Sequence, residues 1–164
     1  GSTQKPLPTK APDNTGNEIA VGTKCSDDSG KAIYNITKTA SSGATVSYVA
    51  PSNKNSTIVN IPATVTIKGV IYNVTGIEKN AFKNNKKLKK VTIGKNIESI
   101  GAGAFYKCKK LKNIVVKSKT IKKVGKACFK GIHKKAVIKV PKARLKAYKK
   151  LFKGKGQKKT VVIK

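Results

Sequence analysis

Acidic residues are scarce in this chain, and their scarcity excludes chemistry that depends on paired carboxylates. Six Asp and Glu residues stand against 37 Lys and Arg, which gives a formal net charge of +31. The six acids are Asp13, Glu18, Asp27, Asp28, Glu78 and Glu98. The chain contains a repeat, described below, and Glu78 and Glu98 occupy different positions within it. The sequence therefore indicates no pair of neighbouring carboxylates of the kind that hydrolyses glycosides.

Arginine is nearly absent as well, because Arg144 is the only one and every other basic residue is lysine. Reading of base edges and bidentate clamping of phosphate favour the planar guanidinium group, whereas the lysine ammonium acts as a point charge. The excess of lysine therefore indicates an attraction to polyanions, and it disfavours sequence-specific recognition of nucleic acid.

Other candidates for chemistry are few. His133, the only histidine, has no acid at a repeating offset, and we interpret it as a solvated surface residue rather than a catalytic base. The run Asp27–Gly30 lacks the further ligands of a calcium loop and is interpreted as a surface turn. We predict no catalytic, cofactor-binding or metal-binding residue, and no cofactor.

No apolar run approaches the roughly 18 residues of a membrane-spanning helix, and no signal peptide is visible. Gly1 and Ser2 resemble a cloning scar, and the proline-rich residues 1–18 predict a flexible linker. We therefore expect the C-terminal part of a larger protein, without membrane insertion.

What the sequence does contain is an internal repeat of about 23 residues. A small residue followed by Phe recurs at Phe82, Phe105 and Phe129, and pairs such as Ile97/Ile100 and Ile121/Val124 keep the same period. Alternating apolar pairs also recur: Val59/Ile61, Val91/Ile93, Ile114/Val116, Ile138/Val140 and Val161/Ile163. Because strand side chains alternate between faces, each pair flanks one outward residue. We predict five short parallel strands in one sheet, with Asn60, Thr92, Val115, Lys139 and Val162 pointing outward.

This period lies within the range of leucine-rich repeats, whose units stack to form a continuous core. The fold class predicted is α/β, a leucine-rich-repeat solenoid of short parallel strands and helical turns around each Phe. Gly101 and Gly125 suit tight turns between these elements. Cys108 and Cys128 are expected to face the core in neighbouring repeats. The sequence leaves open whether a disulfide bridge joins them.

The two ends of the solenoid need caps. A hairpin is expected from the apolar runs 33–36 and 46–49, and a hairpin-like insertion from residues 64–74. At the other end Pro141 is expected to open a helix that stops near Gly154, followed by a strand at 160–163. The predicted organisation is a β-rich N-terminal cap at 19–57, repeats at 58–140 and a C-terminal cap at 141–164.

The segment IPATVTIKGVIYNVTGIEKNAFKNNKKLKKVTIGKNIESIGAGAFYKCKKL resembles the BspA-like, or Treponema-type, leucine-rich repeat family of bacterial surface proteins. The resemblance covers residues 58–140. This chain departs from the pattern in its lysine density, in Lys135 where Leu is expected, and in Cys128 in place of Ala. The resemblance implies a non-enzymatic binding or adhesion module at the cell surface or secreted, without naming a ligand.

Lysines also recur in phase, at Lys87, Lys110 and Lys134 and again at Lys89 and Lys112. Since stacked strands lie about 4.8 Å apart, these lysines should form ladders along one edge, closer together than the Debye length of about 8 Å. Such ladders would bind an anionic polymer, such as teichoic acid or an acidic glycan, or would simply be a solvated surface. Both interpretations stay open.

Three functions therefore stay open for a chain expected to be monomeric. The outward sheet residues or the basic edge could bind a host or bacterial surface macromolecule. The chain could instead be a spacer or cell-wall-retention domain that serves an upstream domain. Non-specific nucleic-acid binding is the third, but aromatic residues are only 5% of the chain and mostly fall at core positions, which disfavours base stacking.

Overall fold

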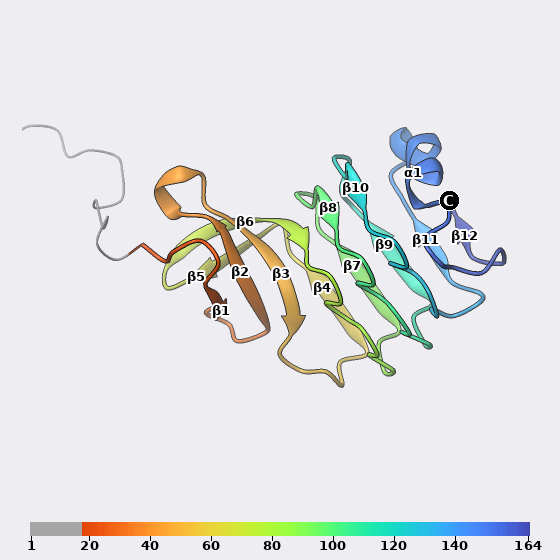
Figure 1. The fold of residues 1–164 in the computed structure, drawn as a ribbon, viewed down its shortest axis with the longest axis horizontal. Coiled ribbons are helices and arrows are strands. Elements are labelled where there is room, and N and C mark those ends of the chain that lie inside the picture. Colours follow the sequence, from red (N-terminus) through yellow and green to blue (C-terminus); the bar gives the residue numbers. More distant parts are fainter. Residues whose placement is uncertain (1–17) are drawn as a thin grey trace, which may run out of the picture.

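In the computed structural model, which describes residues 18–164, the chain winds into an elongated solenoid (Figure 1). Strands stack side by side along the long axis, with a β-rich cap at one end and the helix α1 at the other. Of the linker predicted for residues 1–18, all but Glu18 lies outside the described residues. None of the described helices is both long and apolar enough to cross a membrane.

One wall of the solenoid is a five-stranded parallel sheet, which confirms the predicted stack of five strands. Its strands follow the order β12-β11-β9-β7-β4. Their bounds are β4 Ile58–Ile61, β7 Lys90–Ile93, β9 Asn113–Val116, β11 Val137–Lys139 and β12 Val162–Ile163. The last strand differs from the predicted register, because Ile163, not Val161, pairs with Ile138. The capping helix lengthens this final coil, so that Val162 lies beside Val137.

The opposite wall is a second sheet that the sequence did not predict. Its strands follow the order β1-β2-β3-β6-β8-β10, with β5 paired to β6. Their bounds are β1 Lys24–Ser26, β2 Ala32–Lys38, β3 Thr45–Pro51, β5 Thr64–Ile67, β6 Val70–Ile77, β8 Ser99–Ile100 and β10 Lys123–Val124. The two predicted hairpins are present as antiparallel β2–β3, joined through the short 3-10 helix Ala40–Ser42, and antiparallel β5–β6. Beyond β6 the sheet is parallel, and the coils that begin with β7 and β9 contribute β8 and β10 to it.

Aromatic rings fill the space between the two walls in a continuous row. Phe82 and Phe105 stack with ring centroids 5.3 Å apart, and Phe105 and Phe129 with centroids 6.0 Å apart. Tyr48 extends the row into the N-terminal cap, and Phe152 closes it at the C-terminal end. The row gives every coil a buried apolar contact with its neighbours, as the stacking of repeats requires.

Each repeat Phe lies in a single helical turn, as predicted. The backbone N–H groups of Lys83, Tyr106 and Lys130 donate to the carbonyls three residues earlier, at 3.1, 3.0 and 3.2 Å. One turn is too short to be a regular helix, so α1 (Leu145–Phe152) is the only α-helix among residues 18–164.

The C-terminal cap forms where it was predicted. A 3-10 turn, Lys142–Arg144, leads into α1, so Pro141 precedes this turn instead of opening the α-helix itself. Tyr148 and Phe152 point into the end of the core. Gly154, at φ +71°, follows the helix as expected for a residue that stops it.

Candidate binding surfaces

The outer face of the five-stranded sheet carries two rows of side chains that run across the strands. Asn60, Thr92, Val115 and Lys139 are register partners on successive strands, so the structure brings together four of the five predicted outward residues. The fifth, Val162, belongs to the neighbouring row. That row consists of Ile58, Lys90, Asn113, Val137 and Val162.

Most of this outer face is uncharged, although the chain carries a net charge of +31. Lys90 and Lys139 are its only charged members in the two rows. Ile58 is 61% exposed and Val162 is 49% exposed, while Val115 is half-buried between neighbouring strands. Ile58 and Val162 lie on the two edge strands of the sheet, so the exposed apolar side chains mark the two ends of this uncharged face.

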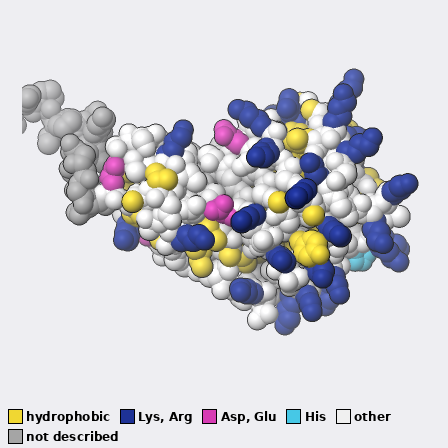
Figure 2. Space-filling model, in the orientation of Figure 1, with side chains coloured by type: hydrophobic (Ala, Val, Ile, Leu, Met, Phe, Trp, Pro, Cys, Tyr) yellow, Lys and Arg dark blue, Asp and Glu magenta, His cyan; other side chains and the backbone are white. Residues whose placement is uncertain are grey.

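The predicted lysine ladders lie on coils that lead into these strands. The Lys112 N–H donates to the Lys89 carbonyl at 3.1 Å, so these two lysines occupy equivalent places in adjacent coils. In the next coil the buried Ala136 takes this place, so this ladder has two rungs. The lysines of the longer ladder, Lys87, Lys110 and Lys134, are all exposed. Figure 2 shows lysines spread over the repeats, with fewer over the N-terminal cap.

Tyr106 is the only one of the nine aromatic side chains that is not buried. The ammonium groups of Lys83 and Lys107 lie 5.6 and 5.4 Å from the centroid of its ring. One exposed ring offers a contact for a single planar group. It does not form the series of stacking platforms that tracks single-stranded nucleic acid.

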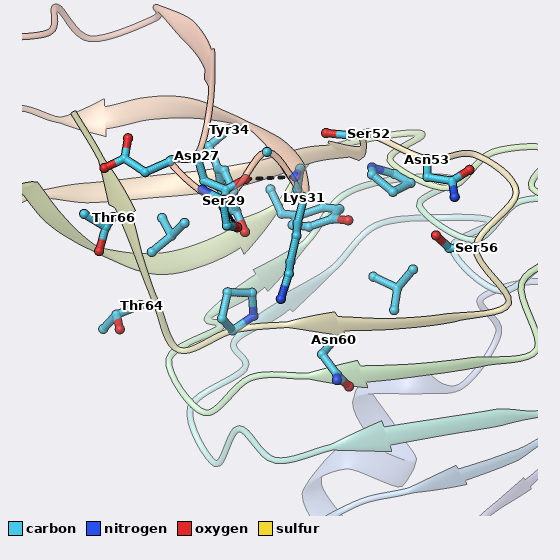
Figure 3. A pocket seen from close by; sticks show the side chains of 18 of the residues that line it. Asp27, Ser29, Lys31, Tyr34, Ser52, Asn53, Ser56, Asn60, Thr64 and Thr66 are labelled. Carbon is cyan, nitrogen blue, oxygen red and sulfur yellow. Dashed lines mark hydrogen bonds between the residues drawn. The ribbon is translucent and has the colours of Figure 1, made fainter. Parts of the chain in front are cut away.

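A groove of about 820 Å³ lies between the Asp27–Tyr34 segment and β4, at the N-terminal end of the same sheet (Figure 3). Sequence reasoning did not find it. Its polar lining includes Lys31 and Asn60, and its floor includes the rings of Tyr34 and Tyr48. The groove therefore meets the outer face at Asn60, which belongs to both surfaces.

The two acids at the groove are held by hydrogen bonds, which supports the predicted turn at Asp27–Gly30. The Asp27 carboxylate accepts hydrogen bonds from the N–H groups of Ser29 and Ala32, at 3.1 and 2.9 Å. Burial acts to raise the pKa of Asp27, but these bonds outweigh it and lower the pKa below its usual value. Asp28 accepts from the N–H groups of Lys68 and Gly69 at the β5–β6 turn, at 2.7 and 3.0 Å. Among the described residues, no three His, Cys, Asp or Glu side chains are grouped to hold a metal ion.

The cysteines and the histidine occupy structural positions. Cys108 and Cys128 are buried free thiols, so the bridge left open by the sequence does not form. Burial raises the pKa of each thiol to about 12, which keeps both protonated and poorly nucleophilic at neutral pH. His133 is partly exposed, in keeping with its interpretation as a surface residue, and its Nδ1 accepts a hydrogen bond from the Lys135 N–H at 3.0 Å.

The parallel coils, the row of stacked rings and the capped ends define a leucine-rich-repeat scaffold of a kind suited to protein interaction. Residues 52–164 match the model of the BspA type leucine rich repeat region in six copies. The chain belongs to this family, as its resemblance predicted. No curated protein sequence matches it.

Solved structures share the fold. A leucine rich cell surface protein from Faecalibacterium prausnitzii has a TM-score of 0.59 and 22% identity over 75% of this chain. A leucine-rich repeat protein from Bacteroides capillosus has the same TM-score and 20% identity over 90% of this chain. The chain spans 38% of the length of the Faecalibacterium protein and 98% of that of the Bacteroides protein.

Proposed function

We propose that the chain is a non-enzymatic binding module of the cell surface, which presents the outer face of its five-stranded sheet to a macromolecular partner such as a host or bacterial surface protein. The observation that carries this proposal is the pair of registered rows on that face. They form a largely uncharged surface on a strongly basic chain, with Ile58 and Val162 exposed at its two edges.

Family and fold support this role and location. BspA type repeats form scaffolds that offer a broad, rigid face, and repeat proteins use such extended faces to bind partners. The similar protein from Faecalibacterium prausnitzii is described as a cell surface protein. The same location for this chain fits its resemblance to bacterial surface proteins.

The lysine ladders favour a second function, retention at an anionic polymer such as teichoic acid. Lys89 and Lys112 take equivalent places in adjacent coils, and like charges on neighbouring coils repel each other unless an anion lies against them. In this function the chain would serve as a spacer or anchor for another domain. Non-specific nucleic-acid binding would use the same charges, with Tyr106 as the only exposed ring.

A salt series distinguishes these functions. Binding is measured to teichoic acid, to duplex DNA and to an extracellular-matrix protein, for the wild-type chain and for Lys87→Ser/Lys110→Ser/Lys134→Ser. We expect both polyanions to bind with a steep loss of affinity as salt rises, because their binding releases counterions. We expect a protein partner to bind with little dependence on salt and to be unaffected by the lysine variant. If only the polyanions bind, the retention function replaces the proposed one.

A further inference from the structure

The strand β4 is an open edge of the five-stranded sheet. It pairs with β7 alone, and its other side faces the groove instead of another strand. An unpaired edge presents a row of backbone donors and acceptors to whatever lies beside it. The strand β12 is the other edge of the sheet and also pairs with one strand alone, but the β4 edge borders an open cavity of about 820 Å³.

The register shows which backbone groups face the groove. Thr57 accepts hydrogen bonds from the N–H groups of Lys89 and Lys90 at 2.7 and 3.1 Å, so its carbonyl points toward β7. Backbone groups of successive strand residues point to opposite sides of the strand. The N–H and C=O groups of Thr57, Val59 and Ile61 therefore point toward β7. The N–H and C=O groups of Ile58 and Asn60 therefore point into the groove. Pro62, which has no N–H, ends this row of donors.

The groove floor adds two hydroxyl groups without partners. Tyr34 and Tyr48 are 2% and 1% exposed, their rings meet edge to face, and both line the cavity. In the part of the chain that the structure describes, neither hydroxyl makes a hydrogen bond, and neither is sealed from solvent. Burial raises the pKa of both groups, so they stay protonated and can donate to a carbonyl oxygen.

Charge at the groove favours an acidic occupant. The carboxylates of Asp27 and Asp28 already accept hydrogen bonds from backbone N–H groups. Lys31 reaches across the cavity from the Asp27–Tyr34 side toward β4 (Figure 3). Lys54, on the loop before β4, and Lys90, beside Ile58 on β7, are exposed. Asp27 and Asp28 remain charged, but their carboxylates are turned to backbone N–H groups. The positive potential comes from Lys31 in the groove, from Lys54 and Lys90 near it, and from the net charge of +31 of the whole chain, which attracts anions.

We propose that this groove binds an extended, acidic peptide segment of a partner protein, which adds to β4 as a sixth strand of the sheet. The peptide backbone pairs with the N–H and C=O groups of Ile58 and Asn60, as in strand addition to other open sheet edges. Its inward side chains are apolar, because they contact Val59 and Val65 and the tyrosine rings. Its acidic side chains lie at the groove mouth near Lys31. The Tyr34 and Tyr48 hydroxyls donate to its polar groups.

This inference deepens the proposed function by naming the kind of segment a protein partner would contribute, but its test does not depend on the rest of the outer face. Val115 lies two strands away from β4. A Val115→Asp variant should therefore leave peptide binding unchanged even if it abolishes binding of a whole partner. The two proposals can fail separately.

The test uses a capped peptide of about seven residues with valine at alternate positions and glutamate between them. It is titrated into the ¹⁵N-labelled full chain to millimolar concentration, and backbone amide shifts are followed by NMR. We expect saturable shifts at Ile58, Val59 and Asn60. The same peptide with N-methylated valines, which cannot donate backbone hydrogen bonds, should bind at least about tenfold more weakly.

Variants of the chain complete the test. Asn60→Pro removes the edge N–H and should weaken peptide binding about tenfold, whereas Asn60→Ala keeps that N–H and should bind like the wild type. If Asn60→Pro fails to fold, Tyr34→Phe/Tyr48→Phe serves instead, because these hydroxyls support no hydrogen bond within the described residues. This double variant should lose affinity while keeping the wild-type unfolding midpoint.

Several results would overturn the proposal. One is the absence of saturable shifts at Ile58 and Asn60 with millimolar peptide. Another is equal binding of the N-methylated peptide, which would show that edge pairing is not involved. A third is binding of neutral oligosaccharides at the same amides, with Asn60→Pro unaffected, which would make the groove a sugar site.

Discussion

Gly101 and Gly125 show how closely successive coils of the solenoid approach each other. Neither has the left-handed backbone of a tight turn, which was the sequence-based reason for placing glycine there. A Cβ atom at Gly101 would lie 2.3 Å from the Lys79 backbone nitrogen, and one at Gly125 would lie 2.2 Å from that of Ala102. The coils cannot separate easily, because the Gly125 N–H donates to the Ile100 carbonyl at 2.8 Å. Glycine is required at these positions for space.

We predict that Gly125→Ala lowers the free energy of unfolding by about 1–3 kcal/mol, because backbone atoms must shift to admit the methyl group. Urea unfolding followed by circular dichroism measures this change. Gly76→Ala is the matched control. Gly76 lies in β6 and, like Gly125, has no positive φ, but its Cβ would meet the Ser99 hydroxyl at 3.1 Å, so a smaller loss is expected. Equal stability of both variants and the wild type would contradict this account of coil packing.

At the scale of elements, one hydroxyl group of the helix α1 makes two hydrogen bonds to the backbone of the repeats. The Tyr148 hydroxyl donates to the Ser118 carbonyl at 2.8 Å and accepts from the Ile121 N–H at 3.1 Å. Both backbone groups lie on the loop between β9 and β10, and Tyr148 itself is fully buried. The cap therefore supplies hydrogen-bond partners that this loop would otherwise find in a following repeat.

Removing this hydroxyl should destabilise the C-terminal end of the solenoid. We predict that Tyr148→Phe costs about 1–3 kcal/mol of unfolding free energy, since it leaves two buried backbone groups without partners. Tyr106→Phe is the control, because Tyr106 is partly exposed and its hydroxyl makes no hydrogen bond within the described residues. Thermal unfolding of both variants tests the prediction. A Tyr148→Phe midpoint equal to that of Tyr106→Phe would count against a hydrogen-bonded cap.

The sequence predicted those elements whose pattern is long enough to be distinctive. β7 and β9 show apolar alternation over four residues, which reveals both the strand and its outward residue. β8 and β10 are only two residues long, so no alternation could show that Ile100 and Val124 belong to a second sheet. The predicted register of β12 was wrong because it assumed that the last coil has the length of the other repeats. That coil contains the helix α1, and the repeat period does not give its length.

At the scale of the whole molecule, the two candidate surfaces differed in how far they could be predicted. The row from Asn60 to Lys139 could be found from the sequence, because repeat phase places equivalent residues side by side. The groove could not, because it joins the Asp27–Tyr34 turn to β4, which belong to no common repeat. Lysine phase likewise predicted that Lys89 and Lys112 take equivalent places in adjacent coils, as they do.

The central claim is that the outer sheet face, and not the lysine charge, carries specific binding. The most direct test measures affinity for a protein ligand whose binding persists at physiological salt. It compares the wild type with a face variant, Thr92→Asp/Val115→Asp, and a lysine variant, Lys87→Ser/Lys110→Ser/Lys134→Ser. We predict at least about a hundredfold loss for the face variant, as for residues central to an interface, and little change for the lysine variant. The account would be contradicted if the lysine variant lost binding and the face variant kept it, or if no ligand survived physiological salt.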